Sequence, residues 1–172
     1  MTSVVIPEVG ETVVFGSEGF ARVEATATRD LLGEPALFLD LFVLDSNMRV
    51  SVPHERALGR GLRSVASAGE IEGMLRDLAE RETTTIAWNR DGRLVKDRWA
   101  EGDLAACGDV LGSLVDVQAT KRLNDAQRTL FDKARRSFVR EASVSLSVDE
   151  AEAERLLDES IANRAPAEPI AE

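Results

Sequence analysis

Apolar and polar residues alternate over most of the first 50 positions, a pattern that predicts β-strands. Short segments rich in Val, Thr, Phe and Leu are separated by turns that contain Gly, Pro, Asp or Asn. Four or five short strands are too few for a two-sheet sandwich, so we expect a small antiparallel barrel of the Tudor or SH3 type. The expected strands are TVVF, FARVEATAT, PALFLDLFVL and MRVSV.

After residue 53 the pattern becomes helical. Ala, Leu, Glu and Arg replace the strand formers, and apolar residues recur at spacings of three and four. Ser67 and Glu70 have the spacing of a capping box, which predicts the start of the first helix. The helices that we expect cover residues 67–82, 89–100, 103–118, 124–143 and 148–162, with N-caps at Ser67, Asn89, Asp103, Asn124 and Ser147.

The two patterns together predict an α+β protein, in which a small Tudor-like β-barrel is followed by an all-α helical bundle. We expect a β domain over residues 1–60, a helical domain over 61–164 and a frayed tail over 165–172. The segment between Pro53 and Ser67 contains Gly59, Gly61 and several arginines, so we interpret it as the hinge and boundary between the domains.

The charge of the chain is unevenly distributed. The formal net charge is -10, which counts against a nucleic-acid partner for the chain as a whole. Residues 88–140, however, hold 11 Lys and Arg against 8 Asp and Glu, so one region is compatible with DNA. Part of its basic set surrounds the expected long helix and includes Lys121, Arg122, Arg128, Lys133, Arg135, Arg136 and Arg140.

The residues that most often carry catalysis or bind metals are scarce. His54 is the only histidine and Cys107 the only cysteine, so no intramolecular disulfide and no Cys-rich zinc site can form. We expect His54 on the surface after the last strand and Cys107 in the core. We therefore expect no enzyme, no cofactor and no metal, and the lack of a leader-like or membrane-spanning segment predicts a cytoplasmic protein.

The segment around Trp88 is the most informative part of the chain. Trp88 stands immediately before the expected N-cap, and Arg90, Arg93 and Lys96 follow at intervals of three along one side of the helix. Such a surface can meet phosphates while the aromatic ring enters a groove or stacks on an exposed base. The sequence predicts a DNA-binding site of these four residues.

Trp88 has a second interpretation, which the residues alone leave open. Its ring can instead pack the start of the helix against the core. We assign Trp99 to the core, because it shares the expected apolar face of this helix with Leu94 and Val95.

Several motifs resemble those of one known family when they are read in order. The N-terminal string VGETVVF with Gly19 is similar to the opening of CarD-type regulators and of the polymerase-interaction domain of transcription-repair coupling factors. The spacing from Trp88 and Arg90 to the AEGD motif at 100–103 resembles the family's Trp-x-Arg and Gly-Asp signature, and LND at 123–125 resembles the start of its long penultimate helix. The resemblance covers residues 8–163.

The resemblance implies a non-enzymatic transcription regulator with two contacts. Its Tudor-like domain would dock on the β subunit of bacterial RNA polymerase, and its helical domain would contact promoter DNA, without sequence specificity, in the minor groove at the upstream edge of the bubble. Family members hold the open promoter complex open. The family's wedge tryptophan falls on Trp88, and its basic DNA contacts fall on Arg90 and Arg93.

The polymerase-binding residues implied by the resemblance are Arg29, Arg49 and Ser51. Ser51 stands where an arginine would touch polymerase, and Arg49 lies two residues earlier on the same strand face. The expected protein is a monomer that associates with the nucleoid through polymerase. The alternative is a protein-protein adaptor whose helical domain binds protein, an alternative that the strong acidity of the chain favours.

Overall fold

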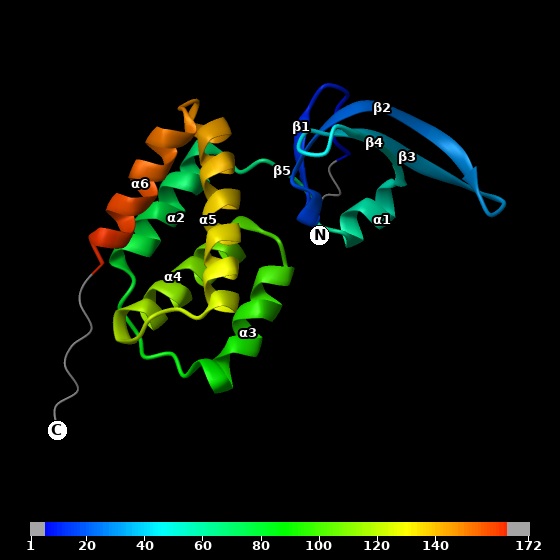
Figure 1. The fold of residues 1–172 in the computed structure, drawn as a ribbon. Helices are drawn as coiled ribbons and strands as arrows, with labels where there is room; N and C mark the ends of the chain where they lie inside the picture. The colour runs from blue at the N-terminus through cyan, green and yellow to red at the C-terminus, as the bar shows by residue number, and fades with distance from the viewer. Residues whose placement is uncertain (1–5, 165–172) are drawn as a thin grey trace. The chain divides into compact units, whose positions relative to one another are not determined.

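The structure is a computed structural model that describes residues 6–164 (Figure 1). The chain divides into two compact units, residues 1–65 and residues 66–172. The first contains a five-stranded antiparallel sheet, and the second is helical. The α+β class predicted from the sequence is confirmed, whereas the tail predicted over 165–172 lies outside the described residues.

The sheet of the first unit has the strand order β4-β3-β2-β1-β5, and each neighbouring pair is antiparallel. The long β2–β3 hairpin is its largest part, and it continues beyond the other strands (Figure 1). The strands are β1 (Thr12–Phe15), β2 (Phe20–Leu31), β3 (Glu34–Val43), β4 (Met48–Pro53) and β5 (Leu62–Ser64).

The alternation along β3 separates a core face from an outer face. Leu39 and Leu41 are fully buried in the sheet core, whereas the alternating residues Phe38, Asp40 and Phe42 remain partly exposed. The residues opposite Asp40 and Phe42 on β4 are the predicted Ser51 and Arg49. The pleat of the sheet thus collects the predicted polymerase-binding residues on its outer face.

Residues 54–64 fold with the sheet, although no helix was predicted at 54–59 and residues 61–64 were assigned to the helical domain. They form the short helix α1 (His54–Gly59) and strand β5, which pairs with β1, so the first unit continues past residue 60 to Val65. His54 is buried, with 6% of its surface exposed, and its predicted surface position is wrong because α1 folds back against β3 and β4.

Gly61, one of the two glycines in the predicted hinge segment, forms a tight backbone crossing with Gly16 inside the first unit. The Gly16 N–H donates to the carbonyl of Gly61 at 3.1 Å, and Gly61 has a φ of 85°. A Cβ atom on Gly16 would lie 2.0 Å from the carbonyl oxygen of Arg60, so no other residue fits there. Gly59 and Gly61 therefore belong to the first unit, and the boundary between the units falls a few residues later, between Val65 and Ala66.

The helices of the second unit enclose one apolar core, which includes the fully buried Ile71, Leu114 and Phe138. Cys107 is buried in the same core, as predicted. The described helices of this unit are α2 (Ala68–Glu80), α3 (Trp88–Ala100), α4 (Leu104–Thr120), α5 (Asp125–Leu146) and α6 (Glu150–Ala162).

Three of the predicted N-caps are confirmed. Ser67 forms a capping box with Glu70, Asp103 accepts a hydrogen bond from the backbone of Ala106, and Asn124 forms a second capping box. In each case a short polar side chain satisfies a backbone N–H group that the first helical turn leaves unpaired.

The other two predicted caps are wrong. Helix α3 starts at Trp88, one residue earlier than predicted; its N-cap is Ala87, which has no side-chain capping hydrogen bond, and the Asp91 carboxylate accepts the backbone N–H of Ala87. Ser147 instead ends α5 in the left-handed conformation, and Asp149 caps α6. Within the described residues, each helix is too short or too polar to cross a bilayer.

Candidate functional site

A hydrogen-bonded cluster on the outer face of the sheet joins two of the predicted polymerase-binding residues. Arg29 on β2 donates two hydrogen bonds to the Asp40 carboxylate on β3, at 3.1 and 2.7 Å. It donates a third to the hydroxyl of Ser51 on β4 at 2.5 Å, and Ser51 donates to Asp40 at 2.6 Å. Asp40 therefore links three strands. This residue was missed in the sequence analysis, although an acidic side chain between Leu39 and Leu41 indicates a position on the outer face of the strand.

The cluster remains accessible to a partner. The side chain of Arg29 is 43% exposed, and three bonds occupy only part of its five N–H donors. Arg29 lowers the pKa of the Asp40 carboxyl from its ordinary value, and the Ser51 hydroxyl lowers it further. The guanidinium carbon of Arg29 also lies 5.4 Å from the centre of the Phe38 ring, which helps to hold the side chain against the sheet.

Arg49 belongs to a neighbouring group on the same face. Its Nε donates to the Glu24 carboxylate at 2.9 Å, and its guanidinium lies 5.3 Å from the Phe42 ring. Arg22 lies 5.6 Å from the same ring on the other side of β3, because both arginines are directly opposite Phe42 in the strand register. The outer face thus presents aromatic rings flanked by arginines, and Phe42 and Arg22 are further residues that sequence reasoning missed.

Trp88 lies at the first position of α3 and is half-buried. Its indole packs against the core of the second unit and over Gly92, where a Cβ atom would approach the ring to 2.7 Å. Trp88, Gly92, Val95 and Trp99 recur at helical spacing and form the inner face of α3. Both interpretations of Trp88 therefore keep a physical basis, because one part of the ring packs and another part stays exposed.

The predicted basic residues lie on the exposed side of α3, but two of them have acidic neighbours. Arg90 pairs with Asp91 at 2.8 Å, and the bond raises the pKa of Arg90. Arg93, whose side chain is 91% exposed, lies 3.8 Å from Asp97. Lys96 is exposed and makes no ion pair with any described residue.

One prediction for α3 is wrong. Leu94 was assigned to the apolar face, yet it is 68% exposed, on the same side of the helix as Arg90 and Asp97. The inner face is instead completed by Gly92, whose lack of a side chain makes room for the Trp88 ring. Trp99 is half-buried and packs against the core, in agreement with its predicted role.

The segment between α2 and α3, which leads into Trp88, is anchored by a buried charge network on α4. Asp116 is fully buried and accepts a hydrogen bond from Thr84 at 3.1 Å and another from Arg164 at 2.5 Å. Arg164 also donates to the carbonyl of Gly112 at 3.0 Å. A buried pair of this kind holds its geometry because either charge alone would be costly to bury.

The basic residues around the long helix α5 are partly engaged in ion pairs. Arg135 is bound by Glu154 and Asp158 on α6, and Arg140 lies 3.9 Å from Glu150. Arg135 in turn lowers the pKa of Asp158. Part of this group therefore holds α5 against α6.

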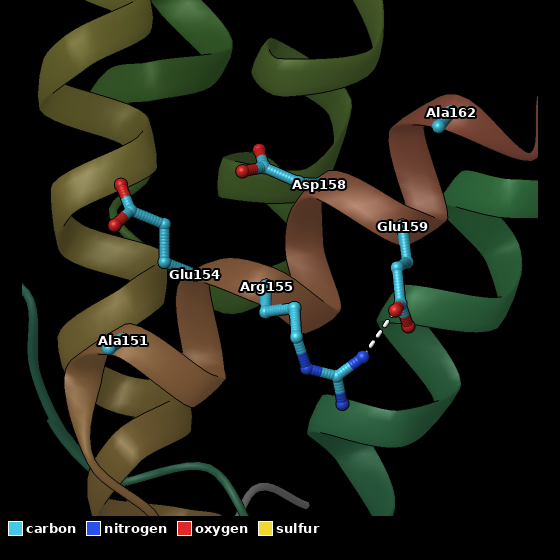
Figure 2. A pocket seen from close by; sticks show the side chains of 6 residues that line it. All are labelled: Ala151, Glu154, Arg155, Asp158, Glu159 and Ala162. Atoms are coloured by element: carbon cyan, nitrogen blue, oxygen red, sulfur yellow. Dashed lines mark hydrogen bonds and ion pairs between the residues drawn. The ribbon is translucent and has the colours of Figure 1, made fainter.

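A shallow hollow on α6 does not offer a reactive site. Figure 2 shows its side chains, in which the Arg155 guanidinium points to Glu159. Its charged groups are engaged in ion pairs along the helix or with α5, and the described residues contain no group of His, Cys, Asp and Glu that could hold a metal ion. The residues that line it are Ala151, Glu154, Arg155, Asp158, Glu159 and Ala162.

Comparison with known proteins identifies a family through the helical unit. A family model described as "CarD, C-terminal domain" matches residues 70–158, a range that contains α3 and more than half of the chain. A Bacillus subtilis (strain 168) protein named "Putative transcription factor YdeB" is 20% identical over 144 residues, which are 83% of this chain and 94% of that protein. Since the match extends over the helices that carry Trp88 and the basic residues beside it, this chain belongs to the CarD family.

Proposed function

We propose that this CarD-family chain is a transcription regulator that docks on the β subunit of RNA polymerase and stabilises the open promoter complex. The β unit would bind polymerase, and α3 would contact promoter DNA at the upstream edge of the bubble. The observation that carries the proposal is the start of α3, where a half-exposed tryptophan lies beside exposed basic residues within the family match.

The outer face of the sheet supports the polymerase contact. Arg29, Arg49 and Ser51 lie on one face, and the guanidinium groups of the two arginines lie over the aromatic rings of Phe38 and Phe42. Arginine and aromatic side chains are enriched at protein interfaces, because they combine large contact area with directional hydrogen bonds. A partner that offers carboxylate or carbonyl groups could bind the remaining donors of Arg29.

The exposed side of α3 supports the DNA contact. Arg90, Arg93 and Lys96 would bind phosphates, while the exposed part of the Trp88 ring would press against the minor groove beside partly unstacked base pairs. An inserted aromatic ring gains most binding free energy where the base pairs are already unstacked. Such base pairs lie at the edge of a bubble. We expect no sequence-specific base reading, because few side chains suited to bidentate base contacts cluster there.

Tethering explains how an acidic protein could act on DNA. The chain carries a net charge of -10, and two of the α3 arginines have acidic neighbours, so free binding to duplex DNA should be weak. Docking on polymerase would raise the local concentration of α3 near the promoter to about the millimolar range. A weak contact then becomes sufficient. In this proposal the chain acts as a cytoplasmic monomer, associates with the nucleoid through polymerase and performs no catalysis.

The exposure of Leu94 favours a second candidate function. An apolar side chain that is 68% exposed beside Arg90 and Asp97 gives α3 a mixed surface of the kind that binds protein. In that case the chain would be an adaptor whose helical unit binds a protein partner.

Open-complex measurements with purified polymerase test both functions. The chain should lengthen the lifetime of the open complex on a responsive promoter, and Arg90→Ala with Arg93→Ala should remove the effect while polymerase binding persists. If the double variant lengthens the lifetime as well as the unaltered chain does, α3 does not act through DNA and the adaptor function gains support.

A further inference from the structure

The tip of the β2–β3 hairpin carries an unusual residue. The last pair of the ladder joins Leu31 to Glu34, and the two residues between them, Leu32 and Gly33, have φ values of 57° and 90°. Positive φ at both central positions is the pattern of a type I′ turn, in which Asn-Gly is the preferred sequence. Leu32 therefore stands where the turn chemistry favours asparagine.

Leu32 is unfavourable in the free protein for two separate reasons. The left-handed conformation brings its Cβ close to the backbone, and the bulky side chain gains no local hydrogen bond in return. The side chain is also 94% exposed, the highest value among the large apolar residues that the structure describes. Within the described residues the other non-glycine positions with positive φ are Asn47 and Ser147, both of them polar.

The strained position is held by the surrounding turn. The backbone N–H of Gly33 donates to the Asp30 carboxylate at 3.1 Å, and β2 and β3 remain paired up to the last residue before the turn. β4 pairs with β3 only from Phe38 onward, so the tip is a two-stranded ribbon that extends beyond the sheet (Figure 1). The fold thus presents Leu32 at the end of an ordered projection.

We propose that Leu32 is an apolar anchor that inserts into a hydrophobic depression on the protein partner that Arg29 faces. The inference rests on the proposed function and identifies that partner surface as part of the polymerase β subunit. Arg29 lies on the same ribbon, three residues before Leu32, and is directly opposite Ala36. Burial of Leu32 in a complex would recover the hydrophobic free energy that the free protein leaves unused, and Arg29 would supply the polar rim of the contact.

The substitution Leu32→Asn distinguishes the role of Leu32 in binding from its role in the turn. The affinity for polymerase should fall, whereas the stability of the protein should rise. Asparagine suits the left-handed position and removes the apolar group, so the variant should melt a few degrees higher and bind purified polymerase at least about tenfold more weakly. The measurements are the melting temperature of the full chain and its dissociation constant for immobilised polymerase. Met48→Gln, at another exposed apolar residue of the same unit, is the matched control and should bind as the unaltered chain does.

The outcomes distinguish the inference from the proposed function. If the unaltered chain binds polymerase and Leu32→Asn binds equally well, the anchor is refuted while the polymerase contact stands. If the unaltered chain does not bind polymerase, the proposed function fails and the anchor fails with it. A dimer of the chain that Leu32→Asn dissociates would assign the anchor to a second copy and would also overturn the proposal.

Discussion

The indole ring of Trp88 lies over Gly92, one turn further along α3, at a distance that leaves no room for a side chain. Gly92 is buried although it lies in the middle of a 13-residue helix, where glycine normally weakens the helix. The relationship explains why a poor helix former occupies this position. It also means that the orientation of Trp88 depends on a residue that would not itself touch DNA.

Gly92→Ala should displace the Trp88 ring from its own helix. A Cβ atom would lie 2.7 Å from the ring, so we expect the emission of Trp88 to shift to longer wavelength as the ring becomes more exposed. The measurement is tryptophan fluorescence in a Trp99→Phe background, which leaves Trp88 as the only emitter. Gly73→Ala in α2 is the control, because a Cβ atom there meets no other atom and should stabilise the helix by about 0.5–1 kcal/mol. An unchanged spectrum for Gly92→Ala would contradict the packing.

Trp88→Ala should shorten the lifetime of the open complex and leave polymerase binding unchanged. Because the ring is half-buried, we also expect a loss of about 1–3 kcal/mol of stability, below the value for a fully buried tryptophan. Trp99→Ala should give a comparable loss of stability with a normal open-complex lifetime when it is assayed well below its melting temperature. Equal effects of the two variants on lifetime would assign both tryptophans to packing.

Arg29→Glu should weaken binding to polymerase by at least about tenfold, because the reversed charge repels a partner surface that attracts Arg29. The new carboxylate would also lie beside that of Asp40. The measurement is titration of immobilised polymerase with the full chain. Asp40→Asn provides the contrast, since it keeps a hydrogen-bond acceptor and leaves the Arg29 charge uncompensated. We expect this variant to bind as well as the unaltered chain or better; a loss equal to that of Arg29→Glu would mean that the intact pair forms the contact.

Asp97→Asn should strengthen the DNA contact of the docked protein by about twofold, because it releases Arg93 from its exposed acidic neighbour. The readout is the open-complex lifetime as a function of salt concentration. Asp132→Asn on α5 removes the same charge without freeing an arginine of α3, so its effect measures the contribution of net charge alone. If the two variants behave alike, the pair between Arg93 and Asp97 does not limit binding.

Acid should remove the stabilising effect of the Arg135–Asp158 pair. Arg135 holds the pKa of Asp158 below its value in the unfolded chain, which is about 3.9, so the pair stabilises the fold above that pH. The contribution is lost as the pH falls through the lower, folded pKa. Asp158→Asn should therefore unfold more easily than the unaltered chain at pH 7, and the difference should become smaller at a pH well below about 3.9. Denaturant titration at both pH values checks this, with Asp77→Asn as the control for loss of a carboxylate. A difference that is undiminished at low pH would exclude the ion pair as its cause.

The sequence by itself determined the elements whose signals are local. Alternation along PALFLDLFVL identified β3, and the capping residues Ser67, Asp103 and Asn124 marked three helix starts, because each depends on neighbours a few positions away. It also identified the segment that contains Trp88, Arg90, Arg93 and Lys96, and the structure places the three basic residues on the exposed side of α3.

Only the tertiary structure decided how distant residues meet. Asp40 joins Arg29 to Ser51 through the register of three strands, and His54 becomes buried when α1 folds against the sheet. The exposure of Leu94 likewise depends on which side of α3 packs on the core, and the buried side is that of Gly92 and Val95. Periodicity reports which side chains prefer burial, whereas the register of strands and the shape of the packed core decide which of them are buried and what they touch.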